Sequence, residues 1–423
     1  MLDIKFIREN VELIKEGLKN KKSDFDLDSF LNLNERRRQL SGEVDNLRSQ
    51  QNNINDQVSF LIKEKKDPKE IIAQSKEISK NISTLDDELK EIRKNFQWQL
   101  LCIPNIAHQS VPAGGEADNK IIKTVGNLKK FNFEPLTHVE LAEHLDIVDF
   151  KRAPKLAGSN FILFKGLGAK LERALINFML DLHTTEHGYT EIAPPFVANT
   201  ASMITTAQLP KLEEDMYRLK DEEHFLIPTA EVPVTNIHSG ETLEEQSLPI
   251  NYTAYTACFR KEAGSYGKDT KGLVRVHQFD KVELVKFTKP DDSYAELENL
   301  LVDACKVIDL LDIPYRTTLL ATGEMSFAAA KCYDIEIYAP GMDRWLEVSS
   351  CSNFEDFQAR RGNIRYRDKI TGKSKFVHTL NGSGVALPRL VVAILENYQQ
   401  KDGSVTIPEV LRKYFHGRTE LTK

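Results

Sequence analysis

The segment from Phe259 to Phe287 combines cations, an aromatic ring and carboxylates at spacings that suit a nucleotide site. Its sequence, FRKEAGSYGKDTKGLVRVHQFDKVELVKF, favours two extended strands joined by a glycine-rich, charged loop from Ala263 to Gly272. Side chains alternate between the two faces of a strand, so Arg260 and Glu262 are expected to share one face of the first strand. On the second strand the residues expected to share a face are Arg275, His277, Phe279, Lys281 and Glu283. Such a face can hold phosphates, a base and an amine. An ordinary polar antiparallel sheet in an α+β domain is the alternative.

The same segment resembles motif 2 of the class II aminoacyl-tRNA synthetases, in the form found in seryl-tRNA synthetases. Three further segments resemble that family and occur in its order: TAE at Thr229 to Glu231, EVSS at Glu347 to Ser350, and NGSGVALPRL at Asn381 to Leu390. One four-residue match would be weak, whereas four matches in the family's order are specific. The resemblance extends over essentially the whole chain.

The resemblance implies catalysis by positioning and charge stabilisation, because in this class the amino-acid carboxylate itself attacks the α-phosphorus of ATP. It assigns Arg260 to the α-phosphate, and Arg389 to the γ-phosphate and the far face of adenine. A guanidinium suits both places, since its fork donates bidentately and keeps its charge. Arg275 is expected to contact a second phosphate or the tRNA end, Phe279 to stack on adenine, and Glu262 to accept from the adenine amine. The full ATP-binding set expected is Arg260, Lys261, Glu262, Arg275, Val276, Phe279, Glu347, Val348, Ser349, Ser350 and Arg389.

By the same resemblance, serine is expected to lie in a small polar pocket whose carboxylates receive its ammonium and its hydroxyl. A pocket built to bond a hydroxyl leaves its partners unpaired with alanine, while the methyl group of threonine must be excluded by shape. For Glu283 the alternative is an exposed strand carboxylate paired with Lys281. The residues expected to form the serine pocket are Thr229, Ala230, Glu231, Glu283, Asn381 and Ser383.

Glu347 and Ser350 are implied to hold the Mg²⁺ that bridges the ATP phosphates, since a hard cation prefers oxygen donors. Residues three apart cannot share a face of a regular strand, so this segment is expected to bulge or end near Val348. The five cysteines lie far apart, with no CxxC pair and no histidine at metal-ligand spacing, so no zinc site is expected. They are expected to be reduced and mostly buried: Cys102, Cys258, Cys305, Cys332 and Cys351.

The motif 3 segment is also supported by its own pattern. Pro388 suits the first turn of a helix, and Leu387, Val391 and Ile394 mark a packed face that leaves Arg389 out. Arg389 is therefore expected near a helix N-terminus, which favours anions. A surface salt bridge would be the ordinary interpretation of one such arginine.

The histidines are expected to be structural or at the surface, because this chemistry needs no general base: His138, His144, His183, His187 and His277.

Two heptad series, from Leu33 to Leu61 and from Ile71 to Gln99, predict a pair of antiparallel helices with a turn at Asp67 and Pro68. About thirty residues per helix would give an arm of roughly 45 Å. A dimerisation coiled coil or a spacer is one interpretation, but the resemblance implies an arm that grips the variable arm of tRNA(Ser). With a net charge of −6, RNA binding must be local. The candidate phosphate contacts are Arg36, Arg37, Arg38, Arg48, Lys63, Lys65, Lys66, Lys69 and Lys76.

The expected fold class is α+β, with a coiled-coil arm and an antiparallel class II catalytic sheet flanked by helices. Residues 1–103 are predicted to form the N-terminal helical domain, 104–130 a linker, and 131–423 the catalytic domain. A helix near Leu171 to Glu186 followed by the strand YTEIAPPF resembles motif 1, which implies a homodimer. Thr205 and Ala207 stand where relatives usually have glycine, so the following loop is expected to be stiffer.

The chain has no run of about 18 uncharged apolar residues, and MLDIKFIREN resembles neither a signal nor a transit peptide. A cytoplasmic protein without a membrane partner is expected. The resemblance implies an enzyme that makes seryl-adenylate from L-serine and ATP and charges tRNA(Ser), with tRNA(Sec) as a second candidate. The alternatives are a catalytically silent paralogue that acts as an RNA-binding or regulatory module, and a ligase that acts on a carrier protein.

Overall fold

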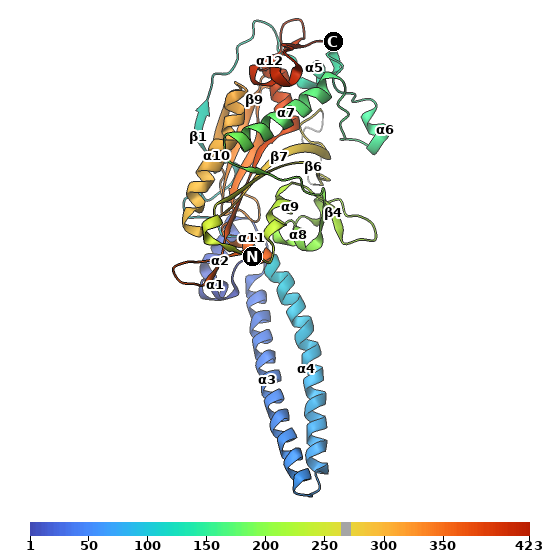
Figure 1. Cartoon of the computed structure of the whole chain (residues 1–423), viewed down its shortest axis with the longest axis vertical. Coiled ribbons are helices and arrows are strands. Elements are labelled where there is room, and N and C mark those ends of the chain that lie inside the picture. Colours follow the sequence, from blue (N-terminus) through green and yellow to red (C-terminus); the bar gives the residue numbers. More distant parts are fainter. Residues whose placement is uncertain (264–271) are drawn as a thin grey trace. The chain divides into compact units, whose positions relative to one another are not determined.

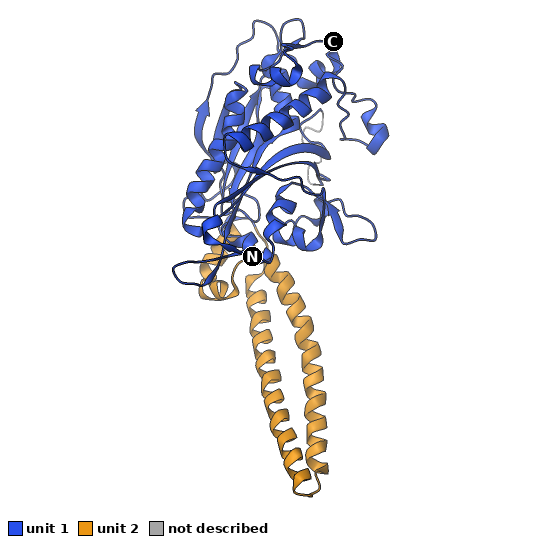
Figure 2. Cartoon of the chain, in the orientation of Figure 1, with its two compact units in different colours: residues 1, 20–22, 105–423 blue, residues 2–19, 23–104 orange. Residues whose placement is uncertain are grey.

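The computed structural model describes residues 1–263 and 272–423. These residues form two compact units (Figure 2). One unit comprises residues 2–19 and 23–104, and the other comprises residues 1, 20–22 and 105–423. Residues 104–130 were expected to be a linker, but 105–130 belong to the larger unit and contain the strand β1 (Lys120–Val125). The prolines and glycines before residue 116 end the helical pattern, but residues 105–130 still pack as part of the larger unit.

The smaller unit is an antiparallel helical hairpin with two short helices before it (Figure 1). The long helices α3 (Leu27–Lys63) and α4 (Lys69–Leu101) confirm the predicted pair, and α4 spans about 50 Å. Asp26 caps α3 by accepting from the backbone N–H of Ser29, and Pro68 stands directly before α4. Leu40 and Val44 of α3 pack against Leu89 of α4 in a small buried core. The short helices are α1 (Ile4–Glu9) and α2 (Val11–Asn20).

The larger unit is built on one sheet, which has eight strands among the described residues, in the order β1-β8-β9-β10-β13-β7-β6-β2. Neighbouring strands are antiparallel except for β2 and β6, which are parallel. This arrangement confirms the predicted α+β fold with an antiparallel sheet. The strands after β1 are β2 (Thr190–Glu191), β6 (Ile250–Phe259), β7 (Gln278–Thr288), β8 (Tyr315–Leu319), β9 (Lys331–Ala339), β10 (Arg344–Asn353) and β13 (His378–Ala386).

Helices cover one face of this sheet. The main hydrophobic core contains Leu171 of α7 (Leu167–Thr185), Leu300 of α10 (Ser293–Leu310) and Val391 of α12 (Leu387–Tyr398), packed with Val282 and Leu284 of β7. Because side chains alternate along β7, the residues between these valine and leucine positions point to the opposite face. Lys281 and Glu283 therefore lie on the face that the three helices leave uncovered, whereas Lys286 lies on the helix-covered face and pairs with Glu296 of α10.

Short elements complete the larger unit. The remaining helices are α5 (His138–His144), α6 (Ala153–Ala157), α8 (Thr200–Thr205), α9 (Glu231–Thr235) and α11 (Phe357–Gly362). The remaining strands are β3 (Val197–Asn199), β4 (His224–Leu226), β5 (Thr242–Glu244), β11 (Arg365–Arg367), β12 (Ser374–Phe376), β14 (Val405–Thr406) and β15 (Glu420–Leu421). None of the described helices is long and apolar enough to cross a membrane.

The two strands predicted around the charged loop are shorter than the sequence suggested. β6 ends at Phe259 and β7 begins at Gln278, so Arg260, Glu262 and Arg275 lie outside both strands. Glu262 has a left-handed backbone with φ of 51°, which no strand residue adopts. The prediction that these side chains share strand faces by alternation is therefore wrong. Most of the loop predicted from Ala263 to Gly272 lies outside the described residues.

Candidate active site

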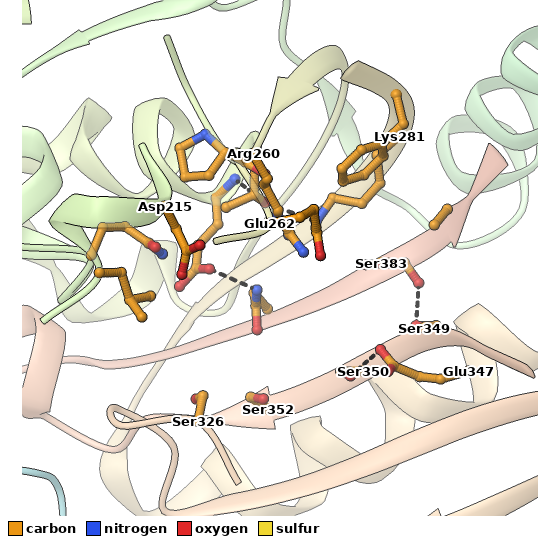
Figure 3. A pocket seen from close by; sticks show the side chains of 18 of the residues that line it. Asp215, Arg260, Glu262, Lys281, Ser326, Glu347, Ser349, Ser350, Ser352 and Ser383 are labelled. Atoms are coloured by element: carbon orange, nitrogen blue, oxygen red, sulfur yellow. Dashed lines mark hydrogen bonds between the residues drawn. The ribbon is translucent and has the colours of Figure 1, made fainter. Parts of the chain in front are cut away.

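A cavity of about 630 Å³ opens on the uncovered face of the sheet (Figure 3). Its walls come from β7, β10 and β13, the N-terminus of α12, and the loops around α8 and α9. All of the predicted site residues line it except Ala230, Lys261 and Glu283. Ala230 and Glu283 are buried, and Lys261 is exposed. The volume is within the range of small-molecule sites.

Two buried carboxylates lie next to each other at the cavity, Glu231 on its wall and Glu283 outside its lining. One amide bridges them, since Asn381 Nδ2 donates to Glu231 Oε2 at 2.9 Å and to Glu283 Oε1 at 3.1 Å. The second oxygen of Glu231 accepts from Gln358 Nε2 at 2.6 Å. Every member of this group is fully or largely buried. Two acids therefore share one pocket that water does not solvate.

Lys281 supplies the positive charge in this pocket. Its ammonium contacts Glu283 and donates to Thr229 Oγ1 at 2.9 Å, while Thr229 Oγ1 donates to Glu283 Oε2 at 3.0 Å. The lysine is almost fully buried, so the alternative of an exposed strand carboxylate paired with Lys281 does not hold for Glu283. Lys281 thus pairs with only one of the two carboxylates, and at Glu231 the charges of Lys281 and Arg260 oppose the effect of burial without cancelling it.

The protonation of Glu231 reflects this unequal pairing of charges. Burial and, next, the neighbouring Glu283 carboxylate together raise the pKa of Glu231 to about 7, although the hydrogen bond from Gln358 lowers it. The substrate-free pocket therefore holds a proton on Glu231 below neutral pH. A cationic ligand bound next to Glu231 would lower its pKa, so the proton would leave.

Three arginines surround the wider part of the cavity, and each is oriented by a specific contact. Arg260 Nε donates to the carbonyl of Pro228 at 3.2 Å, and its guanidinium lies 5.2 Å from the ring centre of Phe279. Arg275 Nη1 donates to Glu262 Oε2 at 3.3 Å. These contacts hold the cations without neutralising them fully, which leaves charge available for an anionic ligand.

Arg389 occupies the third residue of α12, as the position of Pro388 predicted. Its Nε donates to the carbonyl of Val274 at 3.2 Å and its Nη1 to the carbonyl of Glu347 at 2.6 Å. Two backbone carbonyls from different segments therefore fix its direction. A guanidinium at a helix N-terminus adds to the positive potential that the helix dipole already creates there.

The predicted irregularity in EVSS is present. The register of β10 against β9 shifts between Glu347 and Ser349, which is a bulge at Val348. As a result Ser350 Oγ lies 3.1 Å from Glu347 Oε1 on one side of the strand, and it also donates to Asp334 Oδ1 at 2.6 Å. Figure 3 shows Glu347 and Ser350 side by side on the cavity wall.

Some lining residues were not predicted. Lys281 was placed on the correct strand face but not assigned to the site. Asp215 and the segment Ser326 to Ala328 also line the cavity, and no motif signals them. Asn105 Nδ2 holds that segment by donating to the carbonyl of Ala328 at 2.9 Å, a partner 223 residues away. Only the folded chain brings such residues together.

Ala207 also lines the cavity, with φ of 64°. A left-handed backbone suits glycine better than a residue with a side chain, which agrees with the glycine that relatives usually have at this position. Thr205 is buried at the end of α8, where its methyl group lies against Gly362.

Comparison with known proteins identifies the family. Residues 1–107 match the seryl-tRNA synthetase N-terminal domain, and residues 214–398 match the tRNA synthetase class II core domain (G, H, P, S and T). The serine–tRNA ligase of Syntrophobacter fumaroxidans is 54% identical over 415 residues, which is 98% of each chain. That of Bacillus subtilis is 54% identical over 420 residues, which is 99% of each chain. The chain belongs to the seryl-tRNA synthetase family.

Solved structures agree with this assignment. The seryl-tRNA synthetase of Pyrococcus horikoshii, complexed with ATP, superposes with a TM-score of 0.91 at 39% identity and covers 100% of this chain and 99% of its own. The cytoplasmic serine–tRNA ligase of Naegleria fowleri, in complex with AMP, gives a TM-score of 0.87 at 29% identity and covers 100% of this chain and 99% of its own. The resemblance read from four short motifs is thus confirmed for the whole chain.

The raised pKa of Glu231 predicts how stability depends on pH. Because the folded-state pKa of about 7 lies above the ordinary value of 4.5, the proton stabilises the folded state below pH 4.5, and this contribution is lost as pH rises through 7. The gap corresponds to about 3 kcal/mol. Glu231→Gln cannot ionise, so its free energy of unfolding relative to the parent should rise between pH 5 and pH 8. Contacts altered by the substitution add only a pH-independent offset.

Urea unfolding of both proteins at several pH values measures this difference. Glu409→Gln, at an exposed position outside the cavity, is the matched control and should show no such rise. A difference in the free energy of unfolding between Glu231→Gln and the parent that stays constant over this range would mean that the pKa of Glu231 is not raised.

Proposed function

We propose that this chain joins L-serine to tRNA in two steps, through a seryl-adenylate. The observation that carries the proposal is the buried pair of Glu231 and Glu283, bridged by Asn381 and set beside three oriented arginines. A negatively charged pocket of this size suits a small ligand with an ammonium and a hydroxyl group. The arginines suit the phosphates of ATP. The two binding regions share one cavity, as an adenylate-forming reaction requires.

In the first step the carboxylate of serine attacks the α-phosphorus of ATP, the bond to the β-phosphate oxygen breaks, and pyrophosphate leaves. No side chain needs to act as a nucleophile. Arg260 is proposed to hold the α-phosphate, and Arg389 the γ-phosphate together with adenine. Arg275 would contact a second phosphate or, in the second step, the tRNA end. Their fixed charges stabilise the negative charge that builds up on the phosphate oxygens.

ATP would replace interactions that the arginines make in the free chain. Phe279, over which Arg260 now lies, is proposed to stack on adenine, and Glu262, which now accepts from Arg275, to accept from the adenine amine. Both residues line the cavity.

Serine selectivity would come from the buried donors and acceptors of the pocket. The ammonium of serine replaces the stored proton of Glu231 as the missing positive charge, and the hydroxyl can bond to Glu283 or Ser383. Alanine would leave these groups unpaired, at a cost of about 1–3 kcal/mol for each. Threonine would place a methyl group against side chains that are already packed.

Glu347 and Ser350 fit a Mg²⁺ bound together with ATP, because the bulge brings a carboxylate oxygen and a hydroxyl within 3.1 Å of each other. The described residues contain no cluster of three or more histidine, cysteine or acidic ligands. Mg²⁺ needs no such cluster, since one or two protein oxygens with substrate phosphates and water suffice. When bound, the ion would neutralise charge on the phosphates.

The hairpin α3–α4 is proposed to bind tRNA(Ser), with tRNA(Sec) as a second candidate. Its cations are not equivalent. Arg36 and Arg48 pair with Glu88 and Asp86 across the hairpin, each at 2.8 Å, and Arg37 lies 4.4 Å from the ring centre of Phe96. These arginines therefore stabilise the hairpin itself. Better phosphate contacts would be the exposed lysines near the turn: Lys63, Lys65, Lys66, Lys69 and Lys76.

A homodimer and a cytoplasmic location are part of the proposal. They rest on the family and on the motif 1 helix, which corresponds to α7. A catalytically silent paralogue is the weaker alternative, because Arg260, Glu283 and Arg389 are all present and line or support one cavity. A carrier-protein ligase would give the α3–α4 hairpin no role.

The first test is the exchange of pyrophosphate with ATP. The purified protein should catalyse exchange that depends on serine and Mg²⁺ and is insensitive to zinc chelation. Alanine and threonine should support far less exchange than serine. A folded protein that gives no exchange with any amino acid would support the silent paralogue, and exchange with a different amino acid would overturn the serine assignment.

Two substitutions should separate the two binding regions. Arg389→Ala should slow adenylate formation at saturating serine, because charge on the phosphates loses its partner. Glu283→Ala should mainly raise the KM for serine and relax discrimination against alanine. Each lost charged contact is worth roughly 2–4 kcal/mol, or about 30- to 1,000-fold. Arg367→Ala and Glu409→Ala, both exposed and outside the cavity, are the matched controls.

Steady-state exchange kinetics with both substrates varied give the required constants. Parent-like kinetics for both variants would place the pocket elsewhere.

Shortening the arm tests the RNA-binding proposal. Removing residues 44–92 in register and closing the hairpin with a short turn should leave serine activation nearly intact, since no lining residue of the cavity lies before residue 206. Charging of tRNA should collapse, and the remaining tRNA binding should depend less steeply on salt, because fewer counterions are displaced. Filter binding at several salt concentrations measures this slope. A shortened protein that charges tRNA as well as the parent would make the arm a spacer.

A further inference from the structure

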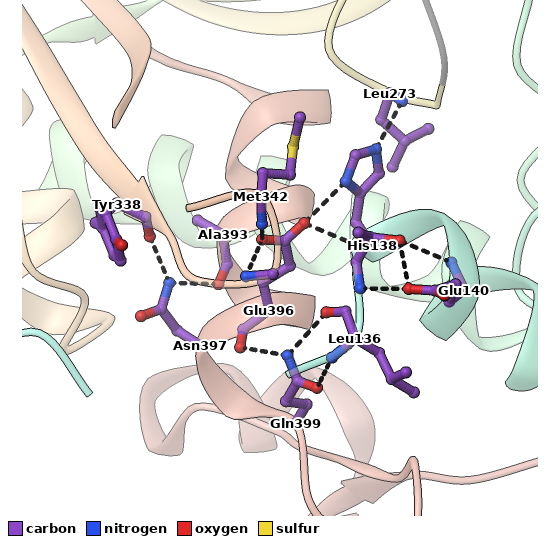
Figure 4. A network of polar contacts seen from close by, with 12 residues as sticks. Leu136, His138, Glu140, Leu273, Tyr338, Met342, Ala393, Glu396, Asn397 and Gln399 are labelled. Carbon is purple, nitrogen blue, oxygen red and sulfur yellow. Dashed lines mark hydrogen bonds and ion pairs between the residues drawn. The ribbon is translucent and has the colours of Figure 1, made fainter. Parts of the chain in front are cut away.

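A buried histidine–glutamate pair lies behind the cavity wall (Figure 4). His138 begins α5 and Glu396 lies in α12, and their side chains are 2% and 0% exposed. Glu396 Oε1 accepts from the backbone N–H of His138 and from its Nδ1, both at 2.9 Å. Glu396 Oε2 accepts from the backbone N–H groups of Gly341 at 2.9 Å and Met342 at 3.1 Å. The carboxylate is therefore fully hydrogen-bonded, and it fixes the histidine ring.

The orientation of the ring determines which nitrogen is free. Since Nδ1 faces a carboxylate, it must carry the hydrogen, and Nε2 of the neutral ring is then an acceptor. The backbone N–H of Leu273 donates to that Nε2 at 3.3 Å. Gly272 passes so close to the ring that a Cβ on it would lie 2.2 Å from Nε2. The chain is thus held against the imidazole by one hydrogen bond and by direct packing.

The residues that follow this contact belong to the ATP region. Leu273, Val274 and Arg275 all line the cavity. The carbonyl of Val274 is the acceptor that orients Arg389 Nε. A displacement of Leu273 would therefore move the acceptor of one phosphate-binding arginine and the backbone of another. The contacts form a closed path, because α12 carries both Arg389 near its start and Glu396 two residues before its last residue, Tyr398.

We propose that His138 is a positioning residue for ATP, although it touches no substrate. By accepting from Leu273 it fixes the backbone of residues 272–275, so that Val274 orients Arg389 and Arg275 faces the phosphates. This inference rests on the proposed function, and it assigns to His138 more than the structural role expected from the sequence. A purely structural role would be limited to filling the core and satisfying Glu396.

Two isosteric substitutions separate these roles, because each keeps one of the two side-chain hydrogen bonds. His138→Asn places an amide near the position of Nδ1, which can still donate to Glu396, but it has no atom at Nε2. His138→Gln places an amide oxygen near Nε2, which can still accept from Leu273, but it has no donor at Nδ1. If His138 positions the ATP site, the asparagine variant should be the more damaging to ATP use. If His138 only donates a hydrogen bond to Glu396, the glutamine variant should be the more damaging to ATP use and to stability alike.

The experiment measures KM for ATP, KM for serine and kcat in the exchange assay, with the thermal unfolding midpoint of each protein. For His138→Asn we expect the KM for ATP to rise about tenfold, as for one lost hydrogen bond, with the KM for serine changed less than twofold. For His138→Gln we expect a lower unfolding midpoint but a KM for ATP nearer the parent. His144→Asn and His144→Gln, at the exposed end of α5, are the controls. An asparagine variant whose KM for ATP rises no more than that of the glutamine variant overturns the proposal.

Two further measurements keep the proposal testable. If a His138 variant does not fold, Gly272→Ala replaces it, since the added methyl group pushes the backbone from the ring while the Glu396 contact remains. That variant should raise the KM for ATP, and an unchanged value would overturn the proposal. If the parent itself shows no exchange, the proposed function fails separately, and calorimetric titration of ATP into the same variants tests the positioning role alone.

Discussion

Glu231 and Glu283 lie together in a buried pocket where Lys281 pairs with Glu283 alone, and this concentration of negative charge is the constraint on which the site depends. Burying two carboxylates is costly unless each is hydrogen-bonded or paired. Asn381 bridges them, Gln358 holds one and Lys281 holds the other, but Glu231 still keeps a proton up to about pH 7. A ligand that brings one ammonium and one hydroxyl completes this arrangement. On the proposed assignment, the ammonium and hydroxyl groups of serine would supply the partners that this pocket lacks.

The sheet allows the fold to contain such a pocket and remain stable. Alternation along β7 sends Val282 and Leu284 into the helix-covered core and Lys281 and Glu283 to the other face. Asn381 and Ser383 occupy the neighbouring strand β13, where they pair in register with Val285 and Glu283. Bulges in β10 and β13 then turn further side chains toward the cavity. Large apolar burial on one face supplies the stability that polar burial on the other face costs.

The sequence predicted this fold and most of the site because the relevant signals are local. The heptad series predict the hairpin, and the short motifs contain the arginines and carboxylates of the cavity. The bulge at Val348 could be predicted because the resemblance implies one shared ion for Glu347 and Ser350, and residues three apart cannot share a face of a regular strand. What could not be predicted depends on distant contacts: the irregular backbone at Glu262, the wall held by Asn105, and the inclusion of residues 105–130 in the larger unit. The contacts of His138 could not be predicted for the same reason, since its partners Leu273 and Glu396 lie 135 and 258 residues away.

The central claim is that the carboxylate pair receives the aminoacyl group while the arginines receive the phosphate and adenine. A crystal structure of the protein with a non-reactive analogue of seryl-adenylate tests this most directly. The account predicts the ammonium and hydroxyl of the analogue within hydrogen-bonding distance of Glu231 and Glu283, with the phosphate mimic at Arg260 and the adenine between Phe279 and Arg389. An analogue bound with its seryl group outside the Glu231–Glu283 pocket would contradict the account.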